Sequence, residues 1–274
     1  MEDIRLIDEI IPAIGECRGV VQGGYHHLPV WQHSLETLKQ FELLYQRKLC
    51  QWPEVRAYLS FQWARGRSRL VPLKLSCLLH DIGKPIAKKK TDKKTIFHTH
   101  EKIGRDRVDG IARSLRLSLR EREFIKHLVF WHLRPGYLAD QITPSKRAIY
   151  RFFRDSGDDG VGIILLSLAD WRATRGPLTD RVKRRRHEKI MFSLLEHFFK
   201  QREEKRIEKI VDGHDIMRRF SLTQGTLIGT LLERIKEEQA VGNVTTKKEA
   251  DQVVARILTQ QRTRTKTGKK KTKK

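Results

Sequence analysis

Apolar residues recur at helical spacing along most of the chain, whereas the alternation of period two that is typical of strands is almost absent. The clearest pattern lies in residues 73–85, where the apolar side chains of one face are Leu75, Leu78, Leu79 and Ile82. Pro72 suits the first turn of a helix there, and Gly83 followed by Pro85 suits its end. The pattern therefore predicts an all-α protein.

The same spacing predicts helices on both sides of this one. We expect a short helix at 3–14 that Pro12 interrupts, a glycine-rich loop at 15–28, and a helix that begins at Pro29. Later helices are predicted at 54–64, 121–132, 145–154, 161–170 and 179–200.

Four polar residues stand in or beside these apolar helices. His80 and Asp81 are adjacent in the last turn of the helix within 73–85, and His33 lies near the start of an earlier helix. Asp170 follows the apolar run 161–169. An ion pair with the nearby Arg172 is the alternative to a role of Asp170 in metal binding. An imidazole or a carboxylate is unfavourable to bury unless it is paired or binds a metal. The four residues therefore predict a site for a divalent metal ion with mixed nitrogen and oxygen ligands.

A second His-Asp pair, His214 and Asp215, has a different setting. No buried apolar helix leads into it, and Asp212-Gly213 is a turn signature. We expect Asp215 to act as a helix N-cap and not as a metal ligand.

Five segments around the predicted ligands carry a family resemblance. They are HHLPVWQHSLETL at 26–38, CLLHDIGKP at 77–85, FHTHEKIG at 97–104, WHLRP at 131–135 and LADWRAT at 168–174. Because of these segments, roughly residues 20–175 resemble the HD superfamily of metal-dependent phosphohydrolases. The similarity is greatest to the HD domain attached to bacterial tRNA nucleotidyltransferases (CCA-adding enzymes).

The resemblance implies two further ligands. His100 fits the place where many HD domains carry another metal ligand, and His132 fits a place that binuclear HD proteins use. His33, His80, Asp81 and Asp170 suffice for one ion, whereas the two added histidines allow a second about 3.5–4 Å away. The expected cofactor is one or two divalent ions of Mg, Mn, Ni, Co or Fe. His26 and His27 are expected to be loop residues or to support the ligands from outside.

The resemblance also predicts the domain organisation. Residues 1–205 correspond to the HD domain, and residues 206–261 resemble the helical C-terminal region of CCA-adding enzymes. Within this region Thr246 and Glu249 form a predicted capping box, and an apolar face contains Leu227, Ile228, Leu231, Leu232 and Ile235. Residues 262–274 have no apolar side chain and are expected to be a disordered basic tail. No Gly-Gly-x-x-Arg-Asp nucleotidyltransferase site is found, so we expect the C-terminal half of such an enzyme.

Charge and cysteine usage narrow the partners and the compartment. The 274 residues include 57 Lys and Arg against 33 Asp and Glu, and the formal net charge is +24. This excess of positive charge favours RNA over a membrane as the binding partner. The alternative is a solvated basic surface that binds no partner and only keeps the protein soluble. Three distant cysteines in apolar contexts (Cys17, Cys50, Cys77) are expected to be reduced. No signal peptide or apolar run of membrane-spanning length is found, which predicts a cytoplasmic protein.

Three functions are consistent with these patterns. The first is a metal-dependent phosphohydrolase in which Asp81 holds the metal, while Lys84 and Arg134 neutralise the phosphate and the developing charge. The family implies phosphomonoesters or 2′,3′-cyclic phosphodiesters of nucleotides or of RNA and tRNA 3′ ends as substrates. The second is an RNA-binding half that works with a separate nucleotidyltransferase subunit and adds no nucleotides itself. The third is a domain that binds a regulatory nucleotide.

Overall fold

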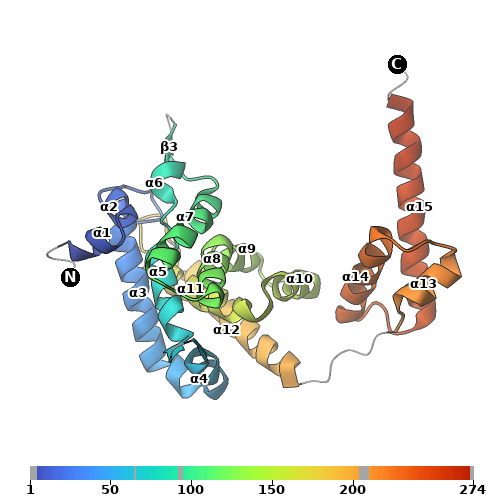
Figure 1. The fold of residues 1–274 in the computed structure, drawn as a ribbon, viewed down its shortest axis with the longest axis horizontal. Coiled ribbons are helices and arrows are strands. Elements are labelled where there is room, and N and C mark those ends of the chain that lie inside the picture. Colours follow the sequence, from blue (N-terminus) through green and yellow to red (C-terminus); the bar gives the residue numbers. More distant parts are fainter. Residues whose placement is uncertain (1–4, 65, 92–94, 204–209, 272–274) are drawn as a thin grey trace. The chain divides into compact units, whose positions relative to one another are not determined.

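The computed structural model describes residues 5–64, 66–91, 95–203 and 210–271, and these are almost entirely helical (Figure 1). Strands in this part of the chain are limited to two short antiparallel pairs, β1 (Gln62–Ala64) with β2 (Arg67–Ser68) and β3 (Lys89–Lys90) with β4 (Thr95–Ile96). The all-α prediction is confirmed. The chain divides into two compact units, Met1–Pro144 with Asp155–Gln201 and Ser145–Arg154 with Arg202–Lys274.

Four helices of the first unit pack around its centre: α3 (Val30–Arg47), α5 (Leu70–Leu79), α8 (Leu119–Trp131) and α11 (Gly160–Ala173). Every residue of α11 from Gly160 to Ala169 is buried, as its unbroken apolar run predicts. The other helices of this unit are α1 (Leu6–Ile10), α2 (Ala13–Cys17), α4 (Pro53–Ser60), α6 (Lys84–Ala87), α7 (His100–Ser114), α9 (Arg134–Ala139) and α12 (Arg181–Glu203).

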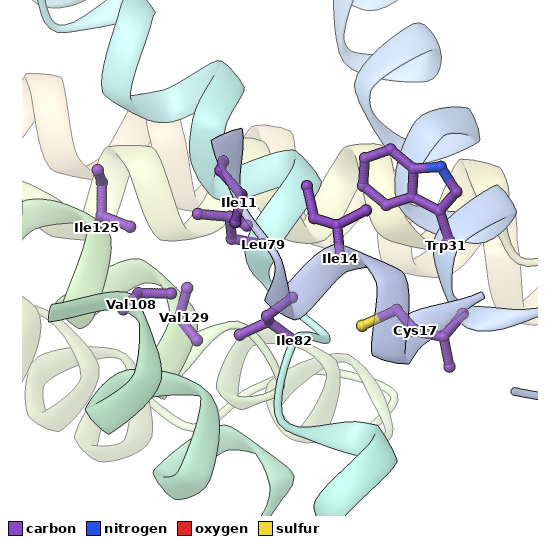
Figure 2. Close-up of a cluster of buried hydrophobic side chains, with 10 residues drawn as sticks. Ile11, Ile14, Cys17, Trp31, Leu79, Ile82, Val108, Ile125 and Val129 are labelled. Carbon is purple, nitrogen blue, oxygen red and sulfur yellow. The ribbon is translucent and has the colours of Figure 1, made fainter. Parts of the chain in front are cut away.

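One part of the core connects the N-terminal helices to the central ones (Figure 2). Ile14 of α2 and Trp31 of α3 are buried beside Leu79 of α5, and Val129 of α8 closes the cluster. Both α1 and α2 are too short to be stable alone, so this apolar contact is what holds α2 in place. The prediction of an interruption at Pro12 agrees with the gap between α1 and α2, although residues 1–4 lie outside the described residues.

Three predicted boundaries were wrong. α2 extends to Cys17, into the predicted loop 15–28. The predicted helix 54–64 ends at Ser60, because the chain continues as β1 and pairs with β2. The helix predicted within 73–85 ends at Leu79 and not near Gly83, which is the N-cap of α6. Pro85 lies in the first turn of α6, a position that proline favours because its missing N–H needs no partner there.

The second unit has a core of its own. It contains α10 (Lys146–Ser156) up to Arg154, together with α13 (Gly213–Phe220), α14 (Thr226–Ala240) and α15 (Lys247–Lys271). Its buried apolar residues are Val211, Ile216, Ile228, Leu231, Ile235, Val244, Ala250, Val253 and Val254. α10 is tied to α14 by the Arg147 guanidinium, which donates to the buried Glu238 carboxylate at 2.8 and 2.9 Å.

Two predictions for the second unit concern its ends. The capping box is confirmed, since the Glu249 N–H donates to Thr246 Oγ1 and the Thr246 N–H donates to the Glu249 carboxylate. The predicted domain boundary between residues 205 and 206 lies outside the described residues. For the predicted tail 262–274, the described backbone of α15 runs to Lys271, whereas residues 272–274 and all side chains from 261 on lie outside the described part.

Candidate metal centre

The six predicted ligands come from five helices of the first unit and meet in its interior. His33 lies on α3, and His80 and Asp81 follow the last turn of α5. His100 is the first residue of α7, His132 follows α8, and Asp170 lies on α11. Five of them are at most 7% exposed, and the Asp170 side chain is 15% exposed. The structure thus brings together residues that are up to 137 positions apart in the sequence.

The ligand atoms fall into two triads, and one carboxylate lies between them. His33, His80 and Asp170 form one triad, and Asp81, His100 and His132 form the other. Asp81 Oδ2 is 3.2 Å from His80 Nε2 and 3.8 Å from His33 Nε2. Its other oxygen, Oδ1, is 3.4 Å from His100 Nε2 and 3.8 Å from His132 Nε2. Asp81 therefore directs one oxygen to each pair of histidines.

Backbone carbonyls fix the orientation of three of the histidine rings. The Nδ1 atoms of His80, His100 and His132 lie 3.0, 2.7 and 2.7 Å from the carbonyl oxygens three residues earlier in each case. A carbonyl oxygen only accepts, so Nδ1 carries the hydrogen in each ring and Nε2 of the neutral ring presents its lone pair to the centre. Outer hydrogen bonds of this kind are how proteins orient imidazole ligands for a metal.

The electrostatics of the centre keep the carboxylates ionised. Burial alone would raise the pKa of Asp81, but His80 and Lys84 hold this pKa well below its usual range. Burial would likewise raise the pKa of Asp170, and its hydrogen bond with His33 (2.9 Å) overcomes this and lowers the pKa. Burial lowers the pKa of His132 to about 3, and neighbouring His100 acts in the same direction. At neutral pH the centre thus offers carboxylates and at least one neutral imidazole.

The residues present fit one or two divalent metal ions. His80 Nε2 and Asp81 Oδ1 are buried and make no hydrogen bond, although a buried polar atom without a partner is destabilising. Imidazole nitrogen suits first-row transition metals such as Fe, Co and Ni, and carboxylate oxygen suits Mg and Mn as well. The orphaned atoms and the mixed donor set are what a metal-ligating site requires.

Gln22 and His26 lie against residues of the centre, and only Gln22 was missed by the sequence pattern. Gln22 accepts a hydrogen bond of 2.6 Å from the Lys84 ammonium, which also donates at 2.6 Å to Asp81 Oδ2. The ring of His26 packs edge-on against that of His33, with centroids 4.6 Å apart, which fits the supporting role expected for it. A lone glutamine in a glycine-rich loop carries no sequence signal for such a role.

The two predicted phosphate-neutralising residues lie in different settings. Lys84 is 6% exposed and its ammonium contacts the Asp81 carboxylate directly. Arg134 lies at the start of α9, where its Nη2 donates to Asp155 at 2.7 Å and its guanidinium covers the Trp131 ring at 4.4 Å. Lys84 thus belongs to the centre itself, and Arg134 lies two residues after the ligand His132.

The second His-Asp pair has a structural role. His214 is exposed, and neither it nor Asp215 belongs to a metal-compatible cluster among the described residues. The predicted position of the N-cap was wrong, because Asp212 is the N-cap of α13 and Asp215 is the third helical residue. The two aspartates form a capping box in which each carboxylate accepts from the other's backbone N–H.

Comparison with known proteins agrees with this geometry. The family model of the HD domain matches residues 30–173, a range that contains all six residues of the centre. The chain belongs to the HD domain family. HD domains form a superfamily of metal-dependent phosphohydrolases. In this chain the two metal-compatible triads lie within the matched range.

Two curated relatives extend the comparison beyond the HD domain. The chain is 30% identical over 258 residues to an A-adding tRNA nucleotidyltransferase of Deinococcus radiodurans, covering 93% of this chain and 53% of that protein. It is 28% identical over 253 residues to a CC-adding tRNA nucleotidyltransferase of Thermus thermophilus, covering 91% and 50%. The chain thus spans about half the length of these relatives. Within the described residues, none of the helices combines the length and apolar character needed to cross a membrane.

Proposed function

We propose that this HD domain is a metal-dependent phosphohydrolase that cleaves phosphomonoesters or 2′,3′-cyclic phosphodiesters at RNA ends, including those of tRNA. The observation that carries the proposal is the position of Asp81, whose two oxygens face two separate pairs of buried histidines. A set of six ligand residues with orphaned polar atoms is destabilising in a core without an ion. The RNA part of the proposal rests on the net charge of +24 and on the two tRNA-acting relatives.

The residues of the centre have distinct roles in this proposal. His33, His80, Asp81, His100, His132 and Asp170 would hold the divalent metal, which would supply a water of lowered pKa and Lewis-acid stabilisation of the phosphoryl group. The backbone-bound Nδ1 atoms of His80, His100 and His132 hold the rings in one tautomer before the substrate arrives. Lys84 places a positive charge beside Asp81 and thereby stabilises the negative charge that grows on the phosphoryl group. Arg134, oriented by Asp155 and Trp131, is the second cation assigned to the phosphate.

The experiment compares the two His-Asp pairs of the same chain. Asp81→Ala and His80→Ala are expected to lose bound divalent metal and all measurable turnover of small phosphoesters, including a 2′,3′-cyclic mononucleotide. His214→Ala is the matched control, and it should keep both the metal and the activity because His214 is exposed and outside the centre. Metal content is measured by elemental analysis. Full activity in Asp81→Ala, or in protein stripped of metal, would contradict the proposal.

The chain matches only about half of each relative, and this favours a second function. Since the chain matches about half of two tRNA nucleotidyltransferases, it is also a candidate for the RNA-binding half of such an activity, with a separate nucleotidyltransferase subunit. The chain alone should then add neither CMP nor AMP to tRNA, and it should bind tRNA and raise the activity of that subunit even as Asp81→Ala. Addition of nucleotides by the purified chain would refute this assignment.

A further inference from the structure

Two cationic helix stripes face each other beside the metal centre. The stripe on α11 and just after its end is Leu168, Trp171, Arg172 and Arg175, and the stripe on α12 is Arg181, Arg184, Arg185 and Glu188. Leu168, Trp171 and Arg172 share one face of α11, and Arg175 follows the end of that helix. The α12 stripe follows the i, i+3, i+4, i+7 spacing of a single helix face. With Thr179 and His187 they line a cavity of about 700 Å³. The basic face of α12 is therefore turned partly toward another helix and not only toward solvent.

The charge of this cavity is strongly unbalanced. Among the described residues that line it are five arginines and one carboxylate, Glu188, which is already engaged by Lys48 at 2.9 Å and by Arg172 at 2.5 Å. In the part of the chain that the structure describes, no carboxylate forms an ion pair with Arg175, Arg184 or Arg185, and Arg175 Nε donates to the Arg172 carbonyl. Like charges that share a concave surface repel one another and focus a positive potential, which an anion in the cavity relieves.

The lining of the cavity includes two stacked aromatic rings. The rings of Trp171 and His187 are stacked with centroids 4.3 Å apart and an angle of 10° between their planes. His187 is 1% exposed, and its Nε2 lies 3.1 Å from Ser167 Oγ. The guanidinium groups of this lining suit a phosphodiester chain, because each arginine can bind two phosphate oxygens at once.

The cavity shares helix α11 with the candidate metal centre. Trp171 directly follows Asp170, whose Oδ1 is 2.9 Å from His33 Nε2. Beyond α11, the Gly176 N–H donates to the Tyr25 carbonyl at 2.8 Å and the Leu178 N–H donates to the Gly24 carbonyl at 3.1 Å. These bonds hold the wall of the cavity against the loop that carries His26, the neighbour of His33. The helix that lines the cavity and the loop bonded to the segment after it thus also carry Asp170 and His26 of the candidate metal centre.

We propose that the cavity between α11 and α12 binds the phosphodiester backbone of an RNA strand whose end lies at the metal centre. This inference rests on the proposed function for the identity of the ligand. It goes beyond that function because it assigns the affinity for RNA to Arg175, Arg184 and Arg185, and because it predicts preference for an RNA end over a free nucleotide.

The test replaces two arginines of the cavity and, as a control, two cations of α12 that do not line it. The cavity variant is Arg175→Gln with Arg184→Gln, and the control is Lys183→Gln with Arg186→Gln, so both variants lose the same charge. Binding of a short single-stranded oligoribonucleotide is measured against salt with the full chain treated with chelator. The cavity variant should bind about tenfold more weakly, and its salt slope should flatten by roughly 0.7 for each phosphate that the two arginines neutralise. The control should stay within about twofold of the unaltered chain.

The outcomes separate this inference from the proposed function. Binding does not depend on turnover, so an inactive chain that still shows the difference between the two variants supports the cavity and refutes only the hydrolase. If the chain is active, the ratio of turnover on an RNA-terminal cyclic phosphate to that on a mononucleotide should fall in the cavity variant alone. Equal loss of binding in both variants would mean that only overall charge matters, and unchanged binding in the cavity variant would mean that RNA lies elsewhere. Either result overturns the inference, provided that thermal unfolding shows both variants to be folded.

Discussion

The Nε2 atoms of His100 and His132 face each other 3.3 Å apart, while the Nδ1 atom of each ring lies 2.7 Å from a backbone carbonyl oxygen. With both Nδ1 atoms donating to carbonyl oxygens, so short a distance between the two Nε2 atoms is unfavourable unless a proton or a cation lies between them. Asp81 Oδ1, which has no hydrogen-bond partner, is 3.4 Å from His100 Nε2. This arrangement favours an ion held by His100, His132 and Asp81 in addition to one held by the other triad.

The two triads predict how many ions are bound. We expect about two divalent ions per chain, as in other two-metal sites, and about one in His132→Ala, because this substitution removes a ligand of one triad only. Asp81→Ala should lose both. Elemental analysis after dialysis measures the stoichiometry. A single ion in the unaltered chain that His132→Ala retains would show that the second triad is not a metal site.

Chelation should destabilise the folded protein. A ligand that binds only the native state stabilises it by RT ln(1 + [L]/Kd), which is about 2.7 kcal/mol when the ligand is present at 100 times its Kd. Stripping the metal should therefore lower the thermal midpoint of the unaltered chain. The control is Asp81→Ala, whose midpoint should not respond to the chelator. The same response in both proteins would indicate metal binding outside the centre.

Close packing at Gly83 predicts that a larger side chain there would displace the backbone next to His80 and Asp81. A methyl group at Gly83 would clash with the backbone of His100 and Gly104, so the turn after Asp81 would have to move away from α7. Gly83→Ala should destabilise the fold by about 1–3 kcal/mol and weaken metal binding. Gly110, an exposed glycine of α7, has nothing within 4 Å of such a methyl group. Gly110→Ala should instead stabilise the protein by up to about 1 kcal/mol. Chemical denaturation and metal titration measure both effects, and similar behaviour of the two variants would contradict the packing argument.

The ion pair between Arg67 and Glu121 predicts a dependence of stability on pH. Glu121 is buried, accepts from Arg67 at 2.7 and 2.9 Å, and caps α8 through Ser118. The hydrogen bond from Arg67 lowers the pKa of Glu121 to about 2, although burial acts in the opposite direction. Because the pKa in the folded state lies below the ordinary value of 4.5, this stabilisation is present above pH 4.5 and is lost as the pH falls toward 2.

Glu121→Gln should therefore lower the free energy of unfolding at neutral pH by about 2–4 kcal/mol and should weaken the dependence on pH between 4.5 and 2. Glu123→Gln is the control on the same helix, since the pair that Glu123 forms with Lys126 is exposed. It should change stability by less than about 1 kcal/mol. Denaturant titrations at several pH values provide the measurement, and equal effects of the two substitutions would refute the role of the buried pair.

Local patterns were sufficient for most of the helices and for the types of ligand, although not for every helix boundary. Helical spacing, Pro12 and the capping box of Thr246 with Glu249 depend on residues within a few positions of one another, so the sequence contains all that decides them. The apolar run before Asp170 likewise shows that this carboxylate enters a buried helix. Motif resemblance added His100 and His132 to the predicted ligands, and the structure places both beside Asp81.

Long-range packing decided the rest. The two oxygens of Asp81 face different histidine pairs only because α3, α5, α7, α8 and α11 meet at one place, and no local pattern determines that meeting. The contact of Lys84 with Gln22 joins residues 62 positions apart, and the basic stripe of α12 becomes the wall of a cavity only when α11 lies opposite it. The sequence by itself determined which residues could bind a metal or an anion. The tertiary structure decided which of their atoms face one another, because distances between side chains on different helices follow from how the helices pack and not from their spacing along the chain.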